Sequence, residues 1–119
     1  MAVNYGKHFS ESEFRCKCCG KVVVSQSLLD NLNKVREELN APVVITSVYR
    51  CVKHNKEVGG KPNSSHLRGF AVDIKCTNGV TRMKLIKILP KYFDRIGINK
   101  AFIHCDVDET LPKEVCFMY

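Results

Sequence analysis

Two histidines and an aspartate are the residues of this chain best suited to chemistry. His66 and Asp73 lie in residues 64–73, which read Ser-Ser-His-Leu-Arg-Gly-Phe-Ala-Val-Asp, and His104 follows Asp73 by 31 residues. Two imidazoles and a carboxylate can hold a zinc ion in three positions and leave a fourth for water. Zinc lowers the pKa of such a water to near 7 and makes it a nucleophile. The pattern predicts a catalytic zinc site.

Alternation in the two flanking segments would bring these side chains together. In a strand over residues 69–75, Asp73 shares one face with small Gly69 and Ala71, while apolar side chains line the other. In a strand over residues 101–107, His104 shares a face with Asp106 and lies opposite an apolar face. Each ligand taken alone is more often an ordinary loop or strand residue. The agreement of all three favours the metal site.

These motifs resemble a known family. The run Ser-x-His-x-x-Gly-x-Ala-x-Asp, followed by His-x-Asp, is similar to the zinc D-alanyl-D-alanine carboxypeptidase family. That family includes phage L-alanoyl-D-glutamate endolysins and vancomycin-resistance D,D-dipeptidases, and its fold resembles the hedgehog signalling domain. Residues 45–50 resemble its Ser-Gly-Tyr-Arg segment, and residues 54–60 the loop before its first zinc histidine. Residues 14–20 resemble the opening of short phage and prophage members, so the resemblance covers most of the chain.

The resemblance implies roles for individual residues. The ligands of one catalytic zinc ion would be His66, Asp73 and His104. Arg50 would bind or polarise a carbonyl or carboxylate of the substrate, with Tyr49 and Ser64 beside it in the substrate site.

The chain departs from the family pattern at two positions. Val48 replaces a usual glycine but leaves Arg50 in place. Ala101 stands where many members carry a catalytic carboxylate three residues before the last histidine. Asp106, two residues after His104, resembles the short phage members and shares the face of His104. We expect Asp106 to be the general base; the alternative is a carboxylate that orients His104.

Composition is consistent with one small peptidase domain over residues 1–119. Hydrophobic content of 45% and charged content of 26% are ordinary for a globular protein, and no apolar run approaches the ~20 residues of a membrane span. We expect a monomer that does not insert into membranes. Residues 1–15 lack the apolar stretch of a secretory signal, which indicates cytoplasmic synthesis and action on the cell wall after release. The net charge of +7 would suit an anionic wall polymer.

Seven cysteines form the second unusual feature, at positions 16, 18, 19, 51, 76, 105 and 116. An odd number cannot pair completely within one chain, and a cytoplasmic origin favours reduced thiols. Cys16 and Cys19 have the Cys-x-x-Cys spacing of half a zinc site, with Cys51 as a possible further partner, but no second such motif exists. Packing or an occasional disulfide is therefore favoured over a second metal. Cys105 falls on the expected core face.

The remaining elements can be assigned from periodicity and capping signals. Ser10 and Glu13 form a capping box at a helix start, with Phe9 and Phe14 as a hydrophobic staple. A longer amphipathic helix is expected over residues 26–39, then a strand over residues 43–46 and a loop over residues 51–65. A second amphipathic helix is expected over residues 81–89, with an apolar stripe of Met83, Leu85, Ile86 and Leu89. The order predicts an α+β fold: a small antiparallel sheet with helices on one face and the zinc site on the other.

The predicted function is zinc-dependent hydrolysis of amide bonds in peptidoglycan stem peptides, by an endolysin-like endopeptidase or a D,D-carboxypeptidase. Two alternatives come from other classes. One is a zinc-bearing binding module that has lost catalysis, which the alanine at position 101 supports. The other is a small basic nucleic-acid-binding protein with a zinc element near Cys16; the zinc motif makes a peptide substrate and no nucleic acid the favoured expectation.

Overall fold

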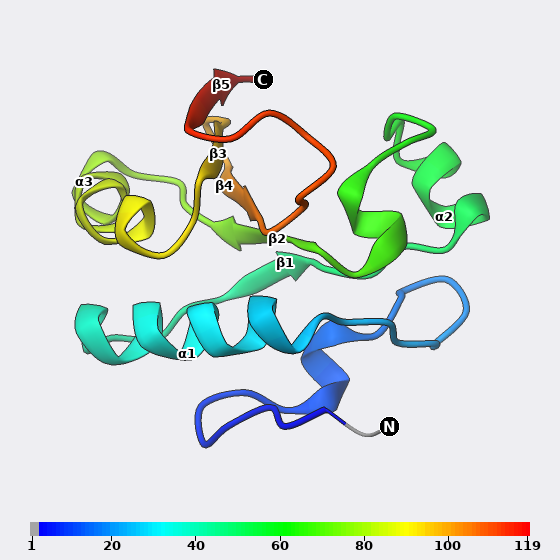
Figure 1. Cartoon of the computed structure of the whole chain (residues 1–119), viewed down its shortest axis with the longest axis horizontal. Helices are drawn as coiled ribbons and strands as arrows, with labels where there is room; N and C mark the ends of the chain where they lie inside the picture. The colour runs from blue at the N-terminus through cyan, green and yellow to red at the C-terminus, as the bar shows by residue number, and fades with distance from the viewer. Residues whose placement is uncertain (1–2) are drawn as a thin grey trace.

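The computed structural model describes residues 3–119, and its α+β class confirms the prediction. Three helices accompany a five-stranded sheet: α1 (Gln26–Leu39), α2 (Val52–Glu57), α3 (Gly79–Ile88), β1 (Ile45–Ser47), β2 (Ala71–Lys75), β3 (Arg95–Ile98), β4 (Phe102–Asp106) and β5 (Val115–Met118). Short 3-10 turns η1 (Glu11–Phe14), η2 (Ser65–Arg68) and η3 (Leu89–Lys91) join them. In Figure 1, α1 runs below β1, and β5, the edge strand at the other end of the sheet, lies at the top with the C-terminus.

The strands follow the order β1-β2-β4-β3-β5. The first three neighbouring pairs are antiparallel, as expected, but β3 and β5 are parallel, so the sheet is mixed. The reason is topological. Both edges of β4 are occupied, by β2 and β3, so the chain leaving β4 must cross to an outer edge. It joins β3 there and runs in the same direction as β3.

The core lies between the helices and one face of the sheet. Helix α1 has the predicted bounds and buries its predicted apolar stripe, and Asn40 ends it in a left-handed conformation with φ of 52°. The sheet contributes alternate residues of β2 and β4, namely Val72, Ile74, Ile103 and Cys105. Alternation therefore leaves Asp73, His104 and Asp106 on the opposite face.

The N-terminal signals are also present in the structure. The expected helix is a single 3-10 turn, η1, and the backbone N–H of Ser10 donates to Glu13 Oε2 at 2.7 Å. The rings of Phe9 and Phe14 meet edge to face with centroids 5.9 Å apart.

Two local predictions were wrong. Residues 51–65 are not wholly a loop, because they contain α2, whose first turn is capped by Cys51: its sulfur accepts the backbone N–H of His54 at 3.4 Å. In α3, Met83 and Ile86 are 57% and 40% exposed, so the expected stripe is only half correct. The helix buries Leu85 and Ile88, and it begins at Gly79, two residues before the predicted start, after an upstream cap.

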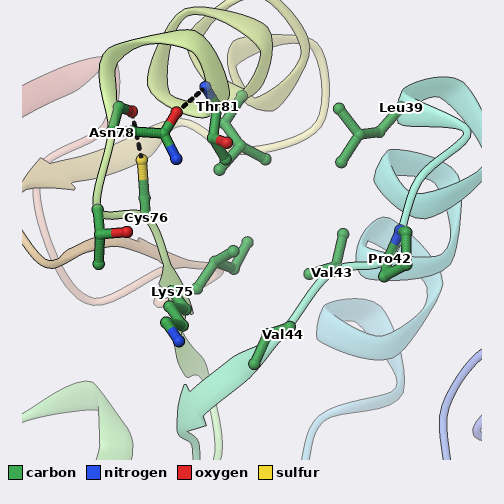
Figure 2. A pocket seen from close by; sticks show the side chains of 11 residues that line it. Leu39, Pro42, Val43, Val44, Lys75, Cys76, Asn78 and Thr81 are labelled. Atoms are coloured by element: carbon green, nitrogen blue, oxygen red, sulfur yellow. Dashed lines mark hydrogen bonds between the residues drawn. The ribbon is translucent and has the colours of Figure 1, made fainter.

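That cap is Asn78, whose side chain accepts the backbone N–H of Thr81 at 2.9 Å. Figure 2 shows this bond at the rim of a hollow bounded by the end of α1, the segment leading into β1, and the start of α3. Leu39, Pro42, Val43 and Val44 line one side of the hollow, and none of the three predicted zinc ligands lines it. Among residues 3–119, no helix has the length and apolarity needed to cross a membrane.

Candidate metal centre

The structure brings His66, Asp73 and His104 into one buried cluster. Asp73 and His104 are directly paired across β2 and β4, and His66 comes from the turn η2. Asp73 Oδ1 lies 3.1 Å from His104 Nδ1 and 3.3 Å from His66 Nε2. One candidate ligand atom from each residue falls within 4.8 Å of the other two.

The position of His66 depends on both ends of η2. Ser64 caps the turn, because its hydroxyl accepts the backbone N–H of His66 at 3.2 Å. Gly69 closes it with φ of +74°, and a side chain there would overlap the backbone at Val23. The glycine of the motif is therefore required by geometry.

A buried carboxylate holds the same turn against the end of β4. Asp108 accepts a hydrogen bond from Ser65 Oγ at 2.7 Å and forms an ion pair with Arg68. Burial would raise the pKa of Asp108, but hydrogen bonds from Thr110 and Ser65 and the charge of Arg68 lower it. Asp108 is thus an ionised anchor for the His66 turn, a role that sequence reasoning missed.

The hydrogen bonds decide which histidine nitrogens carry lone pairs. His66 Nδ1 donates to the carbonyl of Val48 at 2.6 Å, so Nε2 carries the lone pair. That Nε2 is buried and has no hydrogen-bond partner among the described residues. His104 Nε2 donates to Asp106 Oδ2 at 2.7 Å, which leaves its Nδ1 lone pair facing Asp73.

Three electron-pair donors therefore converge in a buried space. Without a cation they would repel one another, and a buried polar atom without a partner is costly. Two imidazole nitrogens and a carboxylate oxygen form a donor set that fits zinc. His66, Asp73 and His104 are the residues that could hold it.

The electrostatics of the cluster agree with this assignment. Burial would raise the pKa of Asp73, but the neighbouring imidazoles of His104 and His66 outweigh it and lower the pKa to about 2. Burial would lower the pKa of His104, but Asp106 and Asp73 outweigh it, so the pKa rises. The carboxylate is thus ionised at neutral pH, and a metal ion competes with a proton for the Nδ1 lone pair of His104.

Asp106 lies behind His104, on the nitrogen remote from Asp73. It is 1% exposed, and besides His104 it accepts Arg95 Nε at 3.0 Å and the backbone N–H of Asp108 at 3.2 Å. Both of its oxygens are therefore engaged. This geometry corresponds to the alternative named above, a carboxylate that orients the imidazole.

Arg50 reaches the cluster from the other side. Its backbone N–H donates to the carbonyl of His66 at 3.2 Å. Its side chain is half-buried, and Nε has no hydrogen-bond partner in the described part of the chain. Burial lowers the pKa of Arg50, and the nearby charges of Asp73 and Tyr119 oppose that change. A guanidinium beside a ligand carboxylate, with donors still free, can bind a substrate oxygen.

The two residues predicted to flank Arg50 in the substrate site have other neighbours in this structure. The hydroxyl of Ser64 serves as the cap of η2 described above. The pKa of Tyr49 is raised by burial and by the thiols of Cys19, Cys51 and Cys16, so this side chain lies beside the cysteine cluster.

The C-terminal strand adds aromatic residues that sequence reasoning missed. The rings of Phe117 and Tyr119 lie 5.6 Å and 6.2 Å from that of His104, centroid to centroid. Gly97 makes room for them, because a side chain there would overlap the ring of Phe117. Burial raises the pKa of Tyr119 to about 12, and the charge of Asp73 adds to the effect, so the phenol keeps its proton. The alternation of Val115, Phe117 and Tyr119 was the available signal, but it did not reveal which strand they join.

Fold and donor set together define the class as a metallopeptidase-like α+β domain. A family model described as Peptidase M15 matches residues 7–106. The chain belongs to the peptidase M15 family, the zinc D-Ala-D-Ala carboxypeptidase family, as the motifs indicated. Peptidases of this family are zinc-dependent and act on peptide substrates. None of the curated proteins compared with the chain matches it.

Proposed function

We propose that this protein is a zinc-dependent, endolysin-like endopeptidase that hydrolyses amide bonds in peptidoglycan stem peptides. The observation that carries the proposal is the convergence of three buried lone pairs, one of them on the unpartnered Nε2 of His66. Membership of the peptidase M15 family supports a peptide substrate.

The protein groups divide the work between them. His66, Asp73 and His104 hold the zinc ion, which when bound activates water and polarises a carbonyl. Arg50 directs its free donors at the scissile carbonyl, where they strengthen as negative charge develops on the oxygen. Asp106 fixes the imidazole of His104 so that Nδ1 keeps its lone pair toward the metal.

The charge of the chain supports a wall substrate. A net charge of +7 attracts the protein to a carboxylate- and phosphate-rich polymer. We propose that it acts on the cell wall after release from the cell in which it is made, as a phage lysin does. In an endopeptidase of this kind, Arg50 serves the scissile bond and does not require a free C-terminal carboxylate.

A second candidate, a zinc-bearing module without catalysis, is supported by one observation. Ala101 is exposed in the turn before β4, so the carboxylate that many family members carry at this position is missing. Asp106, the nearest carboxylate on that strand, is engaged by Arg95 and His104.

Digestion of purified peptidoglycan separates the two candidates. The wild-type protein is incubated with and without a chelator, and with zinc restored, and the released termini are identified by mass spectrometry. The proposal expects new stem-peptide termini that disappear with the chelator and return with zinc. The His66→Ala variant is the matched control, and products from it or from chelated protein would indicate a contaminating hydrolase. Zinc binding without any new termini would establish the non-catalytic module.

A further inference from the structure

A second cluster of metal-binding side chains lies outside the histidine site. The sulfur atoms of Cys16, Cys19 and Cys51 all lie within 4.8 Å of one another. Cys16 and Cys19 belong to the turn between η1 and α1, whereas Cys51 caps α2, so the cluster joins segments 35 residues apart. Cys18, in the same turn, is exposed and is not one of the three residues whose sulfur atoms converge.

Backbone N–H groups are directed at these sulfur atoms. The N–H of Cys51 donates to Cys16 Sγ at 3.4 Å, and the N–H of His54 donates to Cys51 Sγ at 3.4 Å. Burial would raise the pKa of Cys16, but the backbone N–H groups of Cys51, Cys19 and Cys18 outweigh it and lower the pKa to about 7. Such donors stabilise a thiolate, which is the form that binds metal.

The turn itself is built to present two sulfurs together. The N–H of Cys16 donates to the carbonyl of Lys21 at 2.7 Å, and the N–H of Gly20 donates to the carbonyl of Cys16 at 2.9 Å. Gly20 takes a φ of +75°, which glycine adopts without strain. The Cys-x-x-Cys spacing is thereby closed into a compact loop around its two thiols.

A metal explains the cluster better than a disulfide does. One disulfide would pair two sulfurs and leave the third thiol beside it without a partner. Thiolates at about 2.3 Å from one tetrahedral zinc ion lie roughly 3.8 Å apart, so the observed group needs only a small contraction. Soft thiolate donors in this number select zinc among the common divalent ions.

We propose that Cys16, Cys19 and Cys51 bind a second zinc ion of structural role. Cys18, the neighbouring thiol of the same turn, is tested below as a candidate for the fourth ligand. This ion would tie the turn at residues 16–21 to the residue directly after Arg50. The backbone N–H of Arg50 in turn donates to the carbonyl of His66. The second ion therefore supports the loop that carries both Arg50 and His66, and it does not depend on the peptidase activity proposed above.

Metal content of purified variants tests the proposal. Protein prepared under reducing conditions without chelator should contain two zinc ions per chain. His66→Ala should retain one, Cys51→Ser and Cys19→Ser should each retain one, and the matched control Cys116→Ser, which changes an exposed cysteine of β5, should retain two. A single zinc ion in the wild type that is lost with His66→Ala would overturn the cysteine site.

Cobalt substitution and thiol chemistry add readouts that can be made on the wild-type protein. Cobalt in the wild-type protein and in His66→Ala should show an intense thiolate charge-transfer band, and a weaker band in Cys18→Ser would identify Cys18 as a further ligand. An unchanged band would remove Cys18 as the fourth ligand. In the wild type, a thiol reagent should modify these cysteines slowly, and faster once a chelator is added. A Cys16–Cys19 disulfide found by mass spectrometry in protein prepared without reductant, with no second metal, would overturn the proposal.

Discussion

Asp106→Asn is the substitution that tests the site most directly. In the structure the carboxylate receives the Nε2 proton of His104 at 2.7 Å and Arg95 Nε at 3.0 Å. An amide of the same shape has only one acceptor oxygen, so it cannot serve both His104 on the Oδ2 side and the backbone N–H of Asp108 on the Oδ1 side, where Arg95 also lies. If it turns its oxygen to Arg95, its NH₂ group faces His104 and favours the tautomer whose proton sits on Nδ1, the nitrogen needed for the metal.

The expected result is weaker zinc binding. Loss of a carboxylate that orients a metal-bound histidine typically costs 10–100-fold in affinity, which is about 1.4–2.7 kcal/mol. The zinc dissociation constant of the histidine site would be measured by competition with a fluorescent chelator, with His66→Ala identifying which ion belongs to this site. Peptidase rates would then be compared at saturating zinc, where the variant should recover most of its activity. Circular dichroism would verify that the variant is folded.

A different result would refute this reasoning. If Asp106→Asn binds zinc normally but is slower by about 10²–10⁴-fold at saturating zinc, Asp106 transfers a proton as the general base. Asp94→Asn, a change at an exposed aspartate one residue before β3, is the matched control and should alter neither quantity.

Four further predictions follow from the same structure. Arg50→Lys should lower kcat by about 10²–10³-fold, with little change in KM, because an oxyanion donor acts mainly in the transition state. If the wild-type protein cleaves only stem peptides with a free C-terminus, Arg50 binds a terminal carboxylate instead. Zinc at the histidine site should bind more weakly as pH falls from about 8 to 6. The reason is that the pKa of His104 is raised, so a proton competes with the metal for this side chain. In metal-free protein, folding stability should change with pH in the opposite direction to zinc affinity. Charged His104 stabilises the fold below its ordinary pKa of about 6.5, and this stabilisation is lost as pH rises through the raised pKa. Urea unfolding of wild type against His104→Asn would measure it, and equal slopes with pH would contradict it. Gly97→Ala should cost about 1–3 kcal/mol by displacing Phe117, whereas Gly79→Ala, where a side chain meets nothing within 4 Å, should not destabilise the protein.

Local patterns in the sequence were sufficient for much of the fold. The apolar stripe over residues 26–39 predicted α1 with its observed bounds, because helix periodicity is a property of neighbouring residues. Alternation around Asp73 and His104 predicted the face that each side chain occupies, since the two-residue period of a strand is equally local. Motif resemblance identified the peptidase M15 family, and the family match over residues 7–106 agrees with it.

Tertiary structure alone decided how these groups are connected. The free nitrogen of each histidine depends on Val48 and Asp106, and the engagement of Asp106 depends on Arg95, which lies in a strand that the sequence did not reveal. The parallel addition of β5 arises because both edges of β4 are already filled. The meeting of Cys16 with Cys51 across 35 residues likewise depends on chain topology. Periodicity reports which face a residue occupies, but contacts between distant segments depend on the packing of the whole chain.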